Sequence, residues 1–270
     1  MSIITISRGT FSGGKALAEC LSGRLGYPCV SREVIVDAAS EYGISLEKLT
    51  AAMEKPPSFW EQLTGERTAY LHYVRAALYE RALGGNLVYH GHAGHLLLRD
   101  VSPVIRIRVI AGLEFRIKEA MERLRIGRKE ARARIREYDL ARVKWTRFLY
   151  NVDWYDASLF DVVVNVDQMG IECACEVVAR TADLDCFKPT PESQRVIENL
   201  TLSSRVWAAL AKDPSTWSAE VEVTADDGIV TITGSSRLDE VIRAIPTVAG
   251  RVEGVQEVRC HVGLGSVYTR

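Results

Sequence analysis

A glycine-rich loop near the N-terminus constrains the fold of this chain more than any other segment. Residues 9–16 read GTFSGGKA. They follow an apolar run at 3–7 that predicts a strand, and they precede residues 16–25, whose apolar side chains recur at helical spacing. Such a loop can close its backbone N–H groups around a phosphate, and the helix N-terminus adds partial positive charge. The alternative is a tight turn that only leads into an amphipathic helix.

The spacing of the loop fits the phosphate-binding pattern G-x-x-x-x-G-K, whose lysine reaches the outer phosphates of a nucleotide. The predicted nucleotide-binding residues are Gly9, Thr10, Phe11, Ser12, Gly13, Gly14, Lys15 and Ala16. The pattern continues with Ser or Thr, whose hydroxyl binds magnesium, where this chain has Ala16. We therefore expect ATP as the ligand, with Mg²⁺ held mainly by nucleotide oxygens and water.

Length and charge narrow the class of protein. The chain has 270 residues, of which 47% are hydrophobic, so it can form one large domain or two smaller ones. A net charge of −1 provides no overall field that favours nucleic acid or membrane. No apolar run reaches the length of a membrane span. The chain enters a predicted strand at once, which leaves no room for a secretory signal, so we expect a cytoplasmic protein.

The cysteines suggest no cross-link. None of them forms a C-x-x-C pair, and a long chain without a secretory signal is expected to keep its thiols reduced. We predict neither a structural disulfide nor a metal site from this set: Cys20, Cys29, Cys173, Cys175, Cys186 and Cys260.

Strand and helix patterns alternate up to residue 182. This alternation predicts an α/β fold, in which a parallel sheet is covered by helices on both faces. The predicted strands are 3–7, 28–30, 87–90, 104–111 and 160–166. The predicted helical stretches are 16–25, 32–42, 45–54, 58–83, 113–150 and 170–181.

The pattern changes after residue 182. Prolines 189 and 191 indicate a linker over 183–194, and a helix is predicted from 191 to about 210. Two strands of period two, at 219–224 and 229–234, are joined by a D-G turn, the strongest short hairpin signal. A helix at 237–249 and a strand at 255–262 complete a small α+β module over 195–266. We expect this module to fold separately from residues 1–182.

Several segments together carry a family resemblance. They are residues 4–8 (ITISR), 12–15 (SGGK), 91–94 (GHAG), 111–116 (AGLEFR), 139–142 (DLAR) and 160–167 (FDVVVNVD). Through them, residues 1–182 resemble the cytidylate kinase-like branch of the nucleoside monophosphate kinases, which have a P-loop kinase fold. The resemblance implies that Lys15, Arg116, Asp139 and Arg142 are the catalytic residues. Arginines and a lysine suit phosphoryl transfer, which needs positioning and charge neutralisation rather than a covalent nucleophile.

The same resemblance assigns an acceptor site, and there the chain departs from the family. The implied acceptor-binding residues are Ser31, Arg32, His92, Asp139 and Arg142. The family commonly has an acidic residue in place of Ser31 and an arginine in place of His92, and cytidylate kinases carry an arginine where this chain has Ile135. With Ala16, these departures weaken the acceptor site more than the donor site.

Two further patterns have competing explanations. In the arginine-rich stretch at 113–150, we expect most charged side chains to lie on solvated helix faces and to form i,i+4 pairs. Its surplus of positive charge suggests a lid over polyphosphate. A nucleic-acid surface is the disfavoured alternative. The run at 90–95 (HGHAGH) permits three interpretations. His92 is a pH-dependent phosphate contact, a plain loop histidine, or part of a zinc site, and we predict no metal there.

Residues 195–266 resemble a BON domain, through the segments 228–234 (GIVTITG) and 252–258 (VEGVQEV). That family is not enzymatic and is linked to phospholipid or partner binding. The balanced charge here favours a protein partner or self-association over membrane. Two functions therefore stay open. One is an ATP-dependent phosphotransferase acting on a nucleoside monophosphate, of the cytidylate kinase-like type with a weakened acceptor site. The other is a degenerate kinase-like regulatory protein that binds nucleotide and signals through its BON domain without efficient turnover.

Overall fold

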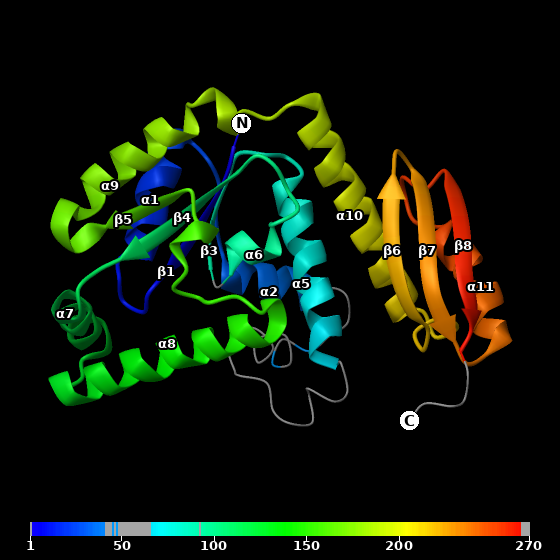
Figure 1. Cartoon of the computed structure of the whole chain (residues 1–270), viewed down its shortest axis with the longest axis horizontal. Helices are drawn as coiled ribbons and strands as arrows, with labels where there is room; N and C mark the ends of the chain where they lie inside the picture. The colour runs from blue at the N-terminus through cyan, green and yellow to red at the C-terminus, as the bar shows by residue number, and fades with distance from the viewer. Residues whose placement is uncertain (1, 41–44, 46, 48–65, 92, 266–270) are drawn as a thin grey trace.

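The computed structural model describes residues 2–40, 45, 47, 66–91 and 93–265 (Figure 1). Its strands are β1 (Ile3–Arg8), β2 (Cys29–Ser31), β3 (Leu87–His90), β4 (Val104–Ile110), β5 (Val162–Asn165), β6 (Glu220–Asp226), β7 (Ile229–Ser236) and β8 (Glu257–Leu264). Its helices are α1 (Gly14–Leu25), α2 (Arg32–Ser40), α5 (Glu66–Ala82), α6 (Gly94–Leu97), α7 (Leu113–Leu124), α8 (Arg128–Tyr150), α9 (Val166–Ala182), α10 (Pro191–Lys212) and α11 (Asp239–Ala249). The predicted helix at 45–54 and the start of the one at 58–83 fall largely outside the described residues. Within the described part of the chain, no helix has the length and apolar character needed to cross a bilayer.

The first sheet confirms the predicted α/β fold class. Its strands lie in the order β2-β3-β1-β4-β5, and every neighbouring pair is parallel. Parallel pairing brings the carboxyl ends of all these strands to one edge. The loop at residues 9–13 leaves β1 at that edge, which is where open α/β sheets bind their ligands.

Helices cover both faces of this sheet, which explains why its strands are almost continuously apolar. On one face, Ile4 and Ile6 of β1 pack with Leu17 of α1 and with α9. On the other face, α2, α5 and α6 form a second cluster, which includes Val74 and Leu97. In Figure 1, α1 and α9 lie together on one side of the sheet, and α5 lies on the other.

The expectation of uniformly reduced thiols was wrong for one pair of cysteines. Cys20 of α1 and Cys175 of α9 form a disulfide, with their Cα atoms 6.2 Å apart. The two residues are separated by 155 positions in the sequence, and only the packing of α1 against α9 brings them together. Cys29, Cys173, Cys186 and Cys260 are free thiols.

The arginine-rich stretch forms two helices rather than one. α7 ends at Leu124, Arg125 takes a left-handed conformation with φ 54°, and α8 begins after Gly127. The two helices pack through a small apolar cluster of Ile117, Ala120, Ala131 and Ile135. Most of the charged side chains on them are exposed and form pairs such as Arg134–Glu130 and Arg123–Glu119, as the solvated-face interpretation predicts.

The second sheet has the predicted hairpin. β6 and β7 are antiparallel, and Asp227 and Gly228 between them have φ values of 50° and 83°, as the hairpin turns favoured for D-G require. β8 adds to β7 in parallel, and α11 supplies the crossover between them. Val230 and Ile232 lie in the core that this sheet forms with α10 and α11.

Helix α10 is packed on two sides. Its Leu202, Val206 and Leu210 belong to the core of the three-stranded sheet, whereas its Ile197 and Ala208 belong to the cluster around α5. Figure 1 shows α10 standing between α5 and β6. The helix starts at Pro191, with a capping box between Thr190 and Ser193, so ordered structure begins within the stretch predicted as a linker.

An aromatic contact joins α10 to α5, one of the helices that cover the first sheet. The indole of Trp207 stacks on the imidazole of His72 at 4.5 Å between ring centroids, and it meets Tyr73 edge-on at 5.1 Å. Arg205 of α10 also pairs with Glu80 of α5. Because these contacts belong to the cluster that covers the sheet, α10 contributes to the stability of the first domain.

We therefore expect Trp207→Ala to lower the free energy of unfolding of the first domain by about 1–3 kcal/mol, through lost apolar contact and aromatic stacking. Urea unfolding of the full chain measures this loss. Trp217→Ala is the matched control, because Trp217 is 67% exposed, and it should cost less than about 0.5 kcal/mol. Equal stability of the Trp207 variant and the wild type would contradict a role for α10 in the first domain.

Candidate functional site

The loop between β1 and α1 has the backbone of an anion cradle. Gly13 adopts φ 83°, and a Cβ atom at Gly14 would lie 2.3 Å from the Cδ of Arg8, so both positions require glycine. Ser12 holds the loop from below, because its hydroxyl donates to the carbonyls of Gly9 (2.8 Å) and Val109 (3.2 Å). The geometry supports the predicted phosphate-binding role of residues 9–16.

Lys15 stands at the start of α1 with its side chain 59% exposed. Its Nζ lies 3.6 Å from the carboxylate of Glu19, one helical turn along and equally exposed. An exposed pair of this kind contributes little to stability. The ammonium group is therefore available to a phosphate at the mouth of the loop.

Three of the predicted catalytic residues meet at Thr10, although they are far apart in the sequence. The carboxylate of Asp139, on α8, accepts hydrogen bonds from the backbone N–H (3.1 Å) and the hydroxyl (2.8 Å) of Thr10. Arg116, on α7, donates to the Thr10 carbonyl at 2.7 Å and to the Asp139 carboxylate at 2.5 Å. Arg142 donates to the Thr10 hydroxyl. The network places two guanidinium groups beside the phosphate loop.

This network is largely shielded from water. Asp139 is only 8% exposed, and the side chains of Arg116 and Arg142 are 15% and 25% exposed. The Arg116 guanidinium also lies against Gly9, where a Cβ atom would come within 3.3 Å of its Cζ. Charge-assisted hydrogen bonds are stronger in such a setting than in water, and they hold α7 and α8 against the loop.

The predicted acceptor residues Ser31 and Arg32 lie at the same edge of the sheet. Ser31 ends β2 opposite His90 of β3, and its hydroxyl accepts a long hydrogen bond of 3.5 Å from the N–H of Val34, near the start of α2. Arg32 is the first residue of α2. His92 lies outside the described residues, so its predicted role stays a prediction. Nearby, Arg8 reaches the Nδ1 of the buried His90 at 3.4 Å.

Ile135 has a structural role. It is 3% exposed and lies in the apolar cluster between α7 and α8. The position where cytidylate kinases carry an arginine therefore contributes no charge to the acceptor side here.

Two residues at this edge, Arg108 and His95, were not among the predicted site residues. Arg108, near the end of β4, donates to the hydroxyl of Ser7 at 3.2 Å, and its guanidinium lies 3.9 Å from the centre of the Trp154 ring. His95, on α6, is buried against Phe160 at 4.6 Å between ring centroids. The available signal was Arg108 itself, which with Arg106 is one of two arginines inside an otherwise apolar predicted strand.

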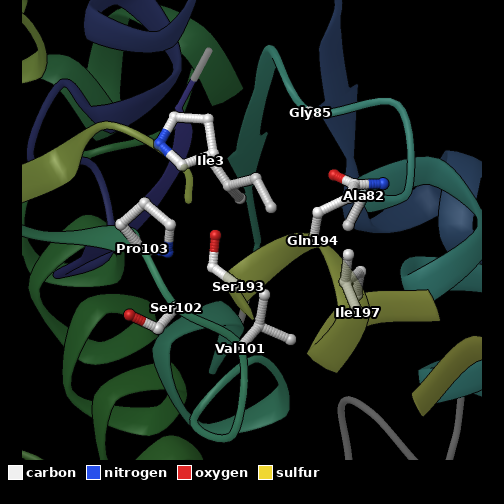
Figure 2. Close-up of a pocket in the computed structure, with 10 residues that line it drawn as sticks. Ile3, Ala82, Gly85, Val101, Ser102, Pro103, Ser193, Gln194 and Ile197 are labelled. Carbon is white, nitrogen blue, oxygen red and sulfur yellow. The ribbon is translucent and has the colours of Figure 1, made fainter. Parts of the chain in front are cut away.

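The described residues offer no clustered metal ligands, and a small cavity lies away from the phosphate loop. In the described ranges, no three His, Cys, Asp or Glu side chains are grouped closely enough to hold a metal ion. A small cavity of about 60 Å³ lies at the opposite edge of the sheet, beside the starts of β1 and β4 and the N-terminal half of α10 (Figure 2). Its lining is mainly apolar, with Ile3, Val101 and Ile197 among its residues. It has no geometric connection with the phosphate loop.

A parallel sheet with a glycine-rich phosphate loop after its first strand defines the class of P-loop kinase-like proteins. The chain belongs to the cytidylate kinase-like family, whose model matches residues 3–168, and residues 199–264 match the BON domain.

Relatives in sequence agree with this assignment, and a solved structure shares the fold. A cytidylate kinase of Ignicoccus hospitalis is 32% identical over 183 residues, which cover 67% of this chain and 98% of the relative. A cytidylate kinase of Staphylothermus marinus is 32% identical over 146 residues, or 53% of this chain and 73% of the relative. The crystal structure of an uncharacterized protein from Eubacterium ventriosum shares the fold, with a TM-score of 0.55 and 19% identity, covering 67% of this chain and 98% of that one.

The buried histidines make stability depend on pH. Burial, reinforced by neighbouring arginines, lowers the pKa of His95 to about 3 and that of His90 to about 4. Both are therefore neutral in the folded protein, whereas in the unfolded chain they bind a proton below about pH 6.5. Their contribution is complete above that pH and is lost as the pH falls towards 4 for His90 and 3 for His95.

We expect His95→Gln to reduce this pH dependence. Each such histidine contributes a slope of about 1.4 kcal/mol per pH unit below its unfolded pKa, and glutamine does not titrate. Urea unfolding at about pH 7 and at about pH 5 measures the slope. His261→Gln, at an exposed position of β8, is the control and should leave the slope unchanged. A His95 variant with the wild-type slope would refute the assignment.

Proposed function

We propose that this protein is an ATP-dependent nucleoside monophosphate kinase of the cytidylate kinase type. The convergence of Arg116, Asp139 and Arg142 on Thr10 of the phosphate loop carries the proposal. Together with Lys15 at the start of α1, these residues place a lysine, two arginines and one carboxylate around the site where a nucleotide phosphate would bind. Such an arrangement suits phosphoryl transfer, in which charge neutralisation and alignment provide most of the catalysis.

Each group has a distinct task in this proposal. The N–H groups of the loop and Lys15 bind the outer phosphates of ATP, since the lysine is exposed at the mouth of the cradle. Arg116 contacts the transferring phosphate, because its guanidinium already lies against the loop backbone. Asp139 and Arg142 hold the acceptor nucleotide, together with Ser31 and Arg32 at the same edge of the sheet, and with His92.

Magnesium fits this site only in part. The loop backbone can hold the phosphates that Mg²⁺ would bridge, but Ala16 at the start of α1 provides no oxygen ligand. Bound Mg²⁺ would neutralise phosphate charge, and its coordination would come from nucleotide oxygens and water.

The BON domain bears on a second candidate function. The carboxylate of Asp139 and both arginines are engaged with one another and with Thr10, an arrangement that also suits a protein that binds nucleotide without efficient turnover. In this alternative, residues 195–266 report nucleotide binding to a protein partner or a second copy. We also propose that the boundary between the domains lies at residues 183–194.

A coupled assay for ADP release tests the proposal. The full chain is incubated with ATP, Mg²⁺ and each of AMP, CMP, GMP and UMP in turn, and we expect release with one or more of them, CMP first. Retained ATP binding without release for any acceptor would reject the kinase and favour the regulatory alternative.

Lys15→Ala should weaken ATP binding by about 1.5–3 kcal/mol, the contribution of a charge-assisted hydrogen bond. Calorimetry of the full chain measures the change. Lys212→Ala, at the exposed end of α10, is the control and should bind ATP like the wild type. Unchanged affinity in the Lys15 variant would remove the loop from the nucleotide site.

Ala16→Thr should strengthen nucleotide binding in the presence of magnesium, because it restores the missing hydroxyl ligand. Ala16→Val is the matched control, since valine has the same shape without the hydroxyl. Titration of Mg²⁺ at fixed ATP should separate the two variants. If threonine and valine give the same magnesium dependence, the ion does not bind at the start of α1.

A further inference from the structure

Arg108 is a buried cation with few partners. It is 6% exposed, and within the part of the chain that the structure describes its guanidinium makes one hydrogen bond, to the neutral hydroxyl of Ser7. Its other contacts are the faces of Trp154, at 3.9 Å, and Phe160, at 5.6 Å. Within the described residues, no carboxylate lies at ion-pair distance from it. Desolvation lowers the pKa of Arg108 to about 10, and the more distant charge of Asp139 opposes that shift only in part.

His95 is a second uncompensated group beside it. The side chain is 3% exposed, and neither ring nitrogen has a hydrogen-bond partner among the described residues. Phe160 contacts both side chains, since its ring lies 4.6 Å from that of His95 and 5.6 Å from the Arg108 guanidinium. Buried polar groups without partners are rare, and each is costly unless a ligand satisfies it.

Both groups lie on the side of the sheet where the phosphate loop begins. Arg108 is paired with Ser7 in the register of β1 and β4, two residues before Gly9. The Trp154 ring that supports Arg108 also lies 6.0 Å from the guanidinium of Arg142, which donates to Thr10. Trp154 therefore connects Arg108 to the loop network through a single side chain.

We infer that Arg108 and His95 form the subsite for the phosphate group of the acceptor nucleotide, and that Ser7 and Trp154 position the guanidinium. The inference rests on the proposed function, since it assigns residues to the acceptor side of the same site. A guanidinium offers several N–H donors in one plane, which suit phosphate oxygens, and a neutral imidazole adds one more.

This assignment accounts for two departures of the chain from the pattern of its family. Ile135 is buried between α7 and α8, and position 92 holds a histidine in place of an arginine. The guanidinium of Arg108, on β4, replaces the charge that is missing from those positions. The assignment also gives a role to one of the two arginines in the otherwise apolar strand β4.

The test compares nucleotides with their nucleosides. CMP and cytidine are titrated separately into the full chain saturated with ADP, and the other three monophosphates with their nucleosides follow. We expect at least one monophosphate to bind about tenfold or more tightly than its nucleoside, as a charge-assisted contact to phosphate predicts. Arg108→Gln should reduce that ratio to near one while leaving nucleoside affinity unchanged, and Arg108→Lys should retain much of it.

Two further variants make the result specific. Arg106→Gln, two residues earlier on β4, is the matched control for charge and should keep the wild-type ratio. Ser7→Ala removes the hydroxyl that orients Arg108 and should lower the ratio about threefold, which provides a second measurement if the Arg108→Gln protein does not fold. ADP affinity, measured in each variant, shows whether the phosphate loop is intact.

Three outcomes would overturn the inference: a preserved ratio in Arg108→Gln, a parallel loss of nucleotide and nucleoside binding, or a wild type that prefers none of the four monophosphates. Failure of the proposed function is distinguishable, because it is read from ADP release and from Lys15→Ala. If the wild type binds a monophosphate more tightly than its nucleoside but releases no ADP, the subsite assignment stands and the proposed phosphotransferase activity is rejected.

Discussion

The rest of the site depends on the hydrogen bonds that the carboxylate of Asp139 accepts. This carboxylate accepts hydrogen bonds from the backbone and side chain of Thr10 and from Arg116, so one buried anion joins the phosphate loop, α7 and α8. Without it, two guanidinium groups would face each other beside the positive end of α1. Removing one partner from such a buried network typically costs about 3–5 kcal/mol, because the charges left behind have no compensation.

The distribution of charge around this carboxylate differs from that expected for the family. At positions 92 and 135 the chain lacks the arginines that the family resemblance implies, and in our proposal the buried guanidinium of Arg108 supplies charge to the acceptor side instead. Trp154 makes this exchange feasible, because an aromatic face stabilises a cation without neutralising it. Among the described residues no carboxylate lies at ion-pair distance from Arg108, whereas Arg116 and Arg142 both pair with Asp139.

The sequence predicted the parts of this structure that depend on local patterns. Alternating strands and helices, the loop at Gly9 to Lys15 and the D-G hairpin all follow from short-range periodicity or turn chemistry, and the structure confirms them. The convergence of Arg116, Asp139 and Arg142 was expected only through family resemblance, because Thr10 and Asp139 are 129 residues apart.

Other features depend on tertiary packing and have no local signal. The Cys20–Cys175 disulfide exists because α1 and α9 share one face of the sheet. His95 looks like a loop histidine in the sequence, and only its burial beside Arg108 distinguishes it. The boundaries of α7 and α8 follow from the left-handed conformation of Arg125. Few residues other than glycine adopt this conformation, so the sequence pattern does not predict the break between the two helices.

Helix α10 gives the two domains a common structural element. Its Leu202 and Val206 are part of the BON core, and its Ile197 and Ala208 are part of the cluster that also contains α5 and α2. α2 begins directly after Ser31, at the acceptor edge of the sheet. A displacement of the BON sheet would therefore act on α5, and through it on α2, which borders the proposed acceptor site. Packed helices transmit such a change only if they have two distinct arrangements, so a regulatory role for the BON domain requires α5 to shift against α10, at the interface of His72 with Trp207.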